Sequence, residues 1–80
     1  MEIKVFGPGC ARCVEAETVV RKAAAEISSD ITVSKVSDFR QIMAARIIST
    51  PAVMVNGEIK CTGRVPAADE IIRWIAEAQV

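Results

Sequence analysis

The sequence GPGCARC, at residues 7–13, marks the point where one hydrophobic pattern gives way to another. Before it, residues 2–6 alternate between polar and apolar side chains, which predicts a β-strand. After it, residues 11–27 carry apolar side chains at helical spacing. Two cysteines, Cys10 and Cys13, therefore lie where a predicted strand ends and a predicted helix begins.

The rest of the chain continues to alternate between strand and helix patterns. Asn56-Gly57 is a strong signal for a two-residue type I′ turn, so the apolar segments on either side are predicted to form a hairpin. The further elements predicted are a loop at 28–30, a strand at 31–36, a helix at 39–47, strands at 52–55 and 58–62, and a helix from about 66 to 79. The order βαβαββα predicts one α/β domain over residues 1–80, with a four-stranded mixed sheet and helices on both faces.

Spacing and capping signals predict several details of the helices. Ser37 is the predicted N-cap of the second helix, with Asp38 in its first turn, and Pro66 fits the first turn of the last helix. The inner face of the first helix is predicted to comprise Cys13, Ala16, Val20, Ala23, Ala24 and Ile27. The inner face of the last helix is predicted to comprise Ala68, Ile71, Ile72, Ile75 and Gln79, with Trp74 at its edge.

The composition of the chain excludes several classes of function. Of its 80 residues, 51% are hydrophobic and 25% are charged, which is enough apolar surface for a folded core. The ten basic and ten acidic residues cancel, so neither nucleic acid nor an anionic membrane is predicted as a partner. No apolar run approaches the ~20 residues of a membrane span, and no signal-peptide core follows Met1, so a cytoplasmic protein is expected. The absence of histidine excludes Cys–His catalysis and histidine-ligated zinc.

The chemistry of the chain is expected to reside in the Cys10-x-x-Cys13 pair. Cys10 would lie at a helix N-terminus, where unpaired amides and the helix dipole lower a thiol pKa, and Arg12 adds positive charge nearby. Cys13, one turn further on, is placed to resolve a mixed disulfide formed by the first sulfur. Half of a zinc site is an alternative, although Cys61 is the only other thiol and the remaining ligands are lacking. Redox chemistry, metal binding and inert thiols are the three interpretations that the residues leave open.

These motifs resemble those of the thioredoxin-like superfamily, in particular its small redox-active disulfide proteins of the thioredoxin/glutaredoxin-like group. The resemblance covers nearly the whole chain. It includes residues 7–13, Thr50-Pro51-Ala52-Val53, Asn56-Gly57 and Gly63-Arg64-Val65-Pro66. It implies that Cys10 is the nucleophile and Cys13 the resolving thiol.

The resemblance also implies supporting residues and partners. Pro51 would be a cis-proline packed against the cysteine pair, and the backbone of Thr50 would offer substrate a strand-like edge. Further support for the site is expected from Gly9, Ala11 and Arg12. The implied activity is that of a thiol–disulfide oxidoreductase, a monomer that acts on disulfide-containing client proteins. An upstream disulfide reductase would reduce it in turn, and no cofactor is required.

The sequence departs from the family pattern at two places, and it also differs from a glutathione site. Thioredoxins have a buried carboxylate in the strand before the CxxC, and that position is Lys4 here. Its charge would favour a Cys10 thiolate, or else it is a solvated strand residue. The dipeptide Ala11-Arg12 is neither the Gly-Pro of thioredoxin nor the Pro-Tyr of glutaredoxin, which leaves the redox potential open. Gly63 stands alone where a glutathione site would use two glycines.

Two alternatives with metal chemistry stay open. A soft-metal, Cu(I)-binding module also carries CxxC after its first strand, but it ends in a strand, whereas residues 66–79 are predicted to be helical. Its loop also normally has Met where this chain has Pro8. The second alternative is an iron–sulfur cluster bridged between two chains through Cys10. Met43 and Met54 fall on apolar faces and are predicted to be core residues rather than metal ligands.

Cys61 is the cysteine outside the CxxC motif. A two-residue turn places Val55 opposite Glu58, and counting back places Cys61 opposite Ala52. Strand alternation puts Ile59 on the same face as Cys61. This face is predicted to lie under a helix, where cysteine packs as a small hydrophobic residue.

Overall fold

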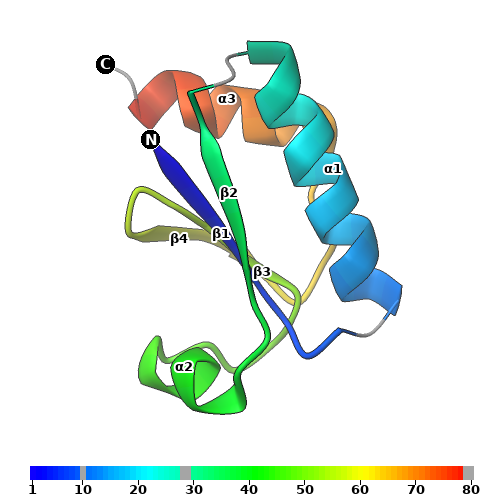
Figure 1. Cartoon of the computed structure of the whole chain (residues 1–80), viewed down its shortest axis with the longest axis vertical. Helices are drawn as coiled ribbons and strands as arrows, with labels where there is room; N and C mark the ends of the chain where they lie inside the picture. Colours follow the sequence, from blue (N-terminus) through cyan, green and yellow to red (C-terminus); the bar gives the residue numbers. More distant parts are fainter. Residues whose placement is uncertain (10, 28–29, 79–80) are drawn as a thin grey trace.

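The computed structural model describes residues 1–9, 11–27 and 30–78 (Figure 1). Its elements are β1 (Glu2–Phe6), α1 (Ala11–Ile27), β2 (Thr32–Val36), α2 (Phe39–Ala44), β3 (Ala52–Val55), β4 (Glu58–Thr62) and α3 (Ala68–Ala78). The predicted order βαβαββα is confirmed, although α2 ends earlier and α3 begins later than predicted. Residues 28–29 of the predicted loop, and Gln79, lie outside the described ranges. No helix within those ranges is long and apolar enough to cross a membrane.

The four strands form one mixed sheet in the order β2-β1-β3-β4. β1 and β2 are parallel, because α1 returns the chain to the same end of the sheet before β2 starts. β3 runs antiparallel to both of its neighbours. In Figure 1, α1 and α3 pack against each other, while α2 lies apart from them at the opposite end of the view. The predicted fold class is confirmed.

The larger core lies between the sheet and the α1–α3 pair. The fully buried strand side chains on this face are Ile3, Val5, Val53 and Val55. The predicted inner face of α1 is buried except for Ile27, which is 37% exposed at the end of the helix. In α3 the prediction was wrong at Trp74, which is buried, and at Ala68 and Ile72, which are exposed. The reason is the i, i+3, i+4 stripe of residues 71, 74 and 75, which leaves Ile72 on the outer side.

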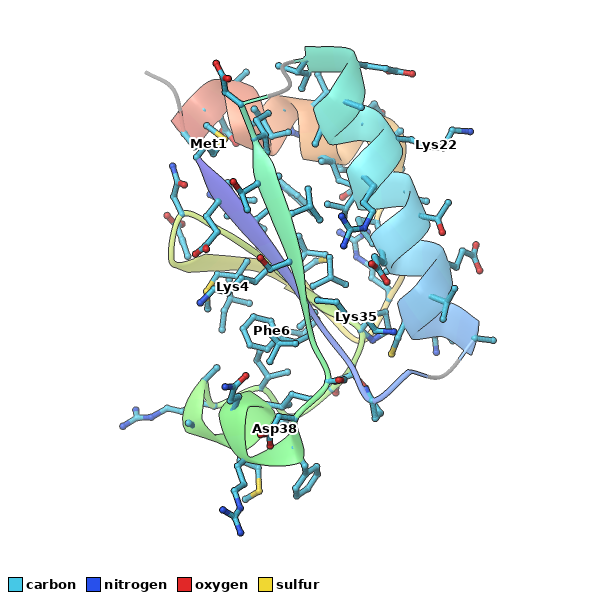
Figure 2. The ribbon with its side chains drawn as sticks, in the orientation of Figure 1. Met1, Lys4, Phe6, Lys22, Lys35 and Asp38 are labelled. Carbon is cyan, nitrogen blue, oxygen red and sulfur yellow. The ribbon has the colours of Figure 1, made fainter. Side chains whose placement is uncertain are left out.

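A smaller core lies on the face of the sheet beneath α2. It comprises Phe6, Ile42, Ile47 and Ala52, with Met54 partly buried against them. Figure 2 shows Phe6 between the sheet and α2. Met43, a predicted core residue, is 61% exposed, because the six-residue α2 buries only Ile42.

The start of α2 is capped one residue later than predicted. The side chain of Asp38 accepts a hydrogen bond from the backbone N–H of Arg40 at 2.8 Å. Asp38 is therefore the N-cap, and the prediction of Ser37 was wrong. Serine and aspartate are both favourable N-cap residues, and nothing else in the sequence indicates which of the two caps the helix.

The β3–β4 hairpin turns at Asn56 and Gly57, whose φ values are 49° and 84°. These two positive values fit the predicted type I′ turn, which places Val55 opposite Glu58 as expected. A β-bulge then breaks the register, with Lys60 as the extra residue of β4. Cys61 consequently pairs with Val53.

The bulge overturns two predictions about β4. Cys61 was expected opposite Ala52, but Thr62 takes that place. Ile59 pairs with Met54 and so lies on the α2 side, whereas Cys61 lies in the α1–α3 core. The two side chains therefore do not share a face. Burial of Cys61 under helices is nevertheless confirmed, at 8% exposure.

The loop between β4 and α3 ends in a capping arrangement rather than in a proline-started helix. Pro66 is buried but lies before α3, so its predicted place in the first turn was wrong. The carboxylate of Glu70 instead accepts a hydrogen bond from the backbone N–H of Ala67 at 3.0 Å. Arg64 donates two hydrogen bonds of 2.7 Å to the same carboxylate. These contacts hold the loop against the first turn of α3.

Candidate functional site

The CxxC motif spans the junction between β1 and α1. Cys10 lies outside the described residues, and its position stays a prediction. Cys13 lies in the first turn of α1 with its side chain fully buried. Gly9 precedes the helix with a φ of 99°, a conformation suited to glycine. Ala11 and Arg12 are both exposed on the first turn.

Gly7 is a site residue that the sequence analysis did not single out. Its N–H donates a hydrogen bond to the carbonyl of Val36 at 2.9 Å, which ties the end of β1 to β2. A β-carbon on Gly7 would overlap with both Sγ and Cβ of Cys13. Glycine is therefore required here so that the backbone can lie directly against the Cys13 side chain. The sequence gives no sign of this contact beyond the glycine itself.

Arg12 connects the start of α1 to the Thr50–Pro51 segment. Its Nη2 donates a hydrogen bond to the carbonyl of Gly63 at 2.9 Å. The N–H of Gly63 in turn donates to the carbonyl of Pro51, also at 2.9 Å. The peptide bond between Thr50 and Pro51 is cis. The Arg12 cation is thus engaged by a backbone carbonyl that is 51 residues away, a partner that motif spacing does not reveal.

A surface groove brings two of the sequence motifs together. Pro8, from the loop before α1, and Thr50, just before β3, both line a groove of about 510 Å³. In Figure 1 this loop and α2 lie at the same end of the molecule. Pro8 and Arg12, on either side of the undescribed Cys10, are therefore both close to the Thr50–Pro51 segment, although they are far from it in the sequence.

Lys4 lies away from this site. Its side chain points away from α1 in Figure 2 and is 40% exposed. Its Nζ is 3.8 Å from the carboxylate of Glu2. Lys4 lies beside Phe6 and Met54 on the α2 face of the sheet. Of the two roles considered for it, the geometry supports a solvated strand residue.

The third cysteine, Cys61, lies in an environment that disfavours the reactive thiolate form. Burial in the α1–α3 core raises its pKa, although the nearby Arg64 partly opposes this effect. A raised pKa disfavours the thiolate, which is the nucleophilic form. Hydrogen bonds from Arg64 and from the N–H of Ala67 lower the pKa of Glu70 to about 2. Within the described residues, no group of three His, Cys, Asp or Glu side chains is arranged to hold a metal ion.

The fold and the matched motifs define a thioredoxin-like protein. The thioredoxin domain family matches residues 1–76, and the chain belongs to this family. It is 37% identical over 71 residues to a thioredoxin of Methanothermobacter thermautotrophicus, a match that covers 89% of this chain and 92% of that one. It is 35% identical over 69 residues to a thioredoxin of Methanocaldococcus jannaschii, covering 86% and 79% of the two chains. Thioredoxins are thiol–disulfide oxidoreductases, and these matches favour that family over the metal-binding alternatives.

Proposed function

We propose that the protein reduces disulfides in client proteins by dithiol exchange through Cys10 and Cys13. The observation that carries the proposal is the buried Cys13 in the first turn of α1, in a chain that belongs to the thioredoxin family. A thiol in that position is protected from solvent, and it follows Cys10 by only three residues in the sequence. This arrangement suits a resolving thiol, which needs to react only with its own partner.

The exchange has two steps that balance in atoms and electrons. The Cys10 thiolate attacks one sulfur of the client disulfide, so a Cys10–client disulfide forms and the other client sulfur leaves as a thiolate. Cys13, as its thiolate, then attacks the Cys10 sulfur and displaces the second client thiolate. The protein ends with a Cys10–Cys13 disulfide, and the client has gained two electrons and, from solvent, two protons.

The electrons must be restored by a second protein. We expect an upstream disulfide reductase to reduce the Cys10–Cys13 disulfide, with no cofactor bound to this chain. A cycle of this kind operates in a reducing compartment, which supports placement in the cytoplasm, and it requires only one copy of the chain.

Insulin reduction with dithiothreitol as the electron source tests the proposal directly. The wild-type protein should accelerate the precipitation of insulin B chains, and Cys10→Ser should abolish this effect. In a separate reaction without dithiothreitol, reduced Cys13→Ser should accumulate a mixed disulfide with insulin through Cys10, detectable as a mass adduct that added reductant removes. Cys61→Ala is the matched control, because it removes a buried thiol outside the motif, and it should retain wild-type turnover. Activity that survives Cys10→Ser would disprove the assignment.

The electron donor can be identified with the same substrate. NADPH with a thioredoxin reductase, glutathione, and a ferredoxin- or flavin-linked reductase are offered in separate reactions. A thioredoxin-like role requires turnover with a protein reductase. Turnover with glutathione alone would indicate a glutaredoxin-like role instead.

A further inference from the structure

The groove beside the proposed active site is strongly apolar for a solvent-exposed surface. Three of its large hydrophobic side chains are well exposed: Phe39 at 69%, Met43 at 61% and Ile48 at 98%. Pro8 and Thr50 line the same groove and connect it to the CxxC loop and to the segment before β3. Neighbouring exposed apolar side chains in a groove are typical of a surface that binds a partner.

Arg46 is the charged residue that lines this groove. Five ion pairs join side chains in the part of the chain that the structure describes, and none of them includes Arg46. A cation without a carboxylate beside it, among exposed apolar side chains, is complementary to a ligand that is both hydrophobic and acidic.

The backbone conformation at position 46 favours glycine. The presence of arginine there therefore points to a role for its side chain. Two hydrogen bonds close α2, from the N–H of Arg46 to the carbonyl of Met43 and from the N–H of Ile47 to the carbonyl of Ile42. This is the Schellman arrangement, in which the residue at the place of Arg46 ordinarily is glycine. Arg46 has a φ of 61°, which disfavours any residue with a β-carbon. Local strain of this kind is often found at functional positions.

We propose that the groove binds the polypeptide segment next to the disulfide of a client protein, and selects segments that carry a large apolar residue and an acidic residue. Phe39, Met43 and Ile48 would contact the apolar side chain, and Arg46 would pair with the carboxylate. The inference rests on the proposed function, because the groove is joined to the active site through Pro8 and Thr50. It names the class of client on which that site acts.

Four short peptides test the preference, each supplied as a disulfide-linked dimer. They share one cysteine and one length, and they combine leucine or serine with glutamate or lysine at two fixed positions. Reduced protein is mixed with each dimer, and the released peptide thiol is followed by chromatography. Each turnover breaks one peptide disulfide, forms the Cys10–Cys13 disulfide and transfers two electrons. The neutral hydroxyethyl disulfide, which has no peptide chain, reports the thiol chemistry alone.

The leucine–glutamate peptide is expected to react about tenfold faster than the serine–lysine peptide. One or two well-placed contacts with the groove would produce a rate ratio of this size. Arg46→Glu should reverse the preference between glutamate and lysine. Ile48→Ser should remove the preference for leucine, and its exposure makes a folding defect unexpected. None of these variants should change the rate with hydroxyethyl disulfide.

Matched controls separate the groove from general charge and surface effects. Lys22→Glu makes the same charge change on α1, far from α2 in Figure 2, and should leave the peptide preference unchanged. Ile72→Ser removes an apolar side chain from the outer side of α3 and should also leave it unchanged. Arg46→Gly should unfold at the same or a higher urea concentration than wild type, because glycine suits the φ, yet it should lose the preference for glutamate.

Several results would overturn the inference. Equal rates with all four peptides, together with normal reduction of hydroxyethyl disulfide, would disprove the selection and leave the proposed function intact. If Lys22→Glu changed the peptide preference as much as Arg46→Glu does, the preference would result from long-range charge and not from contact with the groove. Sedimentation as a dimer that Ile48→Ser dissociates would assign the groove to a second copy of the chain. Failure to react with any disulfide would remove the proposed function, and this inference with it.

Discussion

The two faces of the sheet differ in how completely they bury hydrophobic side chains. On the face covered by α1 and α3, the apolar side chains of β1 and β3 are almost fully enclosed. On the face covered by α2, four buried residues form a small cluster, while Phe39 and Met43 of the same helix remain in solvent. Two long helices packed against each other enclose the larger core, whereas the six-residue α2 covers only the small cluster beneath it.

This difference separates stability from recognition within one small chain. Enclosed side chains on the α1–α3 face stabilise the fold, and the exposed ones around α2 are available for contact with another molecule. The proposed active site lies between the two, because Cys13 belongs to α1 while Pro8 and Thr50 reach the groove beside α2. Substitutions on the α1–α3 face should therefore change the stability of the fold, and substitutions around α2 should change contact with another molecule.

The largest expected effect is on the enclosed face. Ile75→Ala removes a fully buried side chain of α3 and should lower the free energy of unfolding by about 2–5 kcal/mol. Ile48→Ala, on the α2 side, removes a side chain that is 98% exposed and should change it by less than about 0.5 kcal/mol. Urea denaturation of both variants measures the contrast. Similar losses for the two variants would contradict the division between the faces.

Gly7→Ala should break the contact between the end of β1 and Cys13. The added β-carbon overlaps with the Cys13 side chain, so α1 or β1 must shift, at an expected cost of about 1–3 kcal/mol in unfolding free energy. Pro8→Ala is the neighbouring control, since Pro8 is exposed and its substitution fills no occupied space. Wild-type stability of Gly7→Ala in thermal and urea unfolding would show that the approach is looser than described.

Arg12→Ala should loosen the connection between α1 and the loop at Gly63. Loss of this hydrogen bond should lower the unfolding free energy by about 1 kcal/mol, the usual value for one such bond. Arg21→Ala is a control on the same helix, where an exposed i, i+4 ion pair with Glu17 is worth only about 0.3–0.5 kcal/mol. If both variants lose the same small amount, the long-range bond has no special role.

The smallest expected effect is a pH dependence at the start of α3. Glu70 has a pKa lowered from 4.5 to about 2, so its contribution to stability is complete above pH 4.5 and is lost as the pH falls toward 2. Glu70→Gln should remove this part of the acid dependence while leaving stability at low pH nearly unchanged. Urea midpoints of both proteins across that pH range provide the measurement. Parallel curves for the two proteins would mean that Arg64 does not hold the carboxylate.

Local sequence signals predicted the elements of this fold well. The Asn56-Gly57 turn and the βαβαββα order are confirmed, because both depend on short-range pattern and turn chemistry. The predictions that failed depend on single-residue shifts. One extra residue, Lys60, moved Cys61 to the opposite face from Ile59, and two equally good caps could not be distinguished at Ser37 and Asp38.

The site was harder to predict, because its contacts join distant parts of the chain. The approach of Gly7 to Cys13 and the bond from Arg12 to Gly63 depend on tertiary packing, and no spacing rule contains them. Exposure of Met43 also required the structure, since an apolar residue at helical spacing is ordinarily in the core. Sequence reasoning proposed the CxxC pair as the site, but the contacts of Gly7 and Arg12 around it became visible only in the structure.

The bulge in β4 determines which face of the sheet carries the sulfur of Cys61. Strict alternation would have paired Cys61 with Ala52, on the face of the sheet beneath α2, where the neighbouring Ile59 is 38% exposed. The extra residue turns Cys61 toward Val53 in the enclosed core instead. An accessible thiol outside the CxxC motif could form a disulfide with a client protein or with a second copy of the chain. One inserted residue in an edge strand therefore encloses the third sulfur, and burial there also raises the pKa of its thiol.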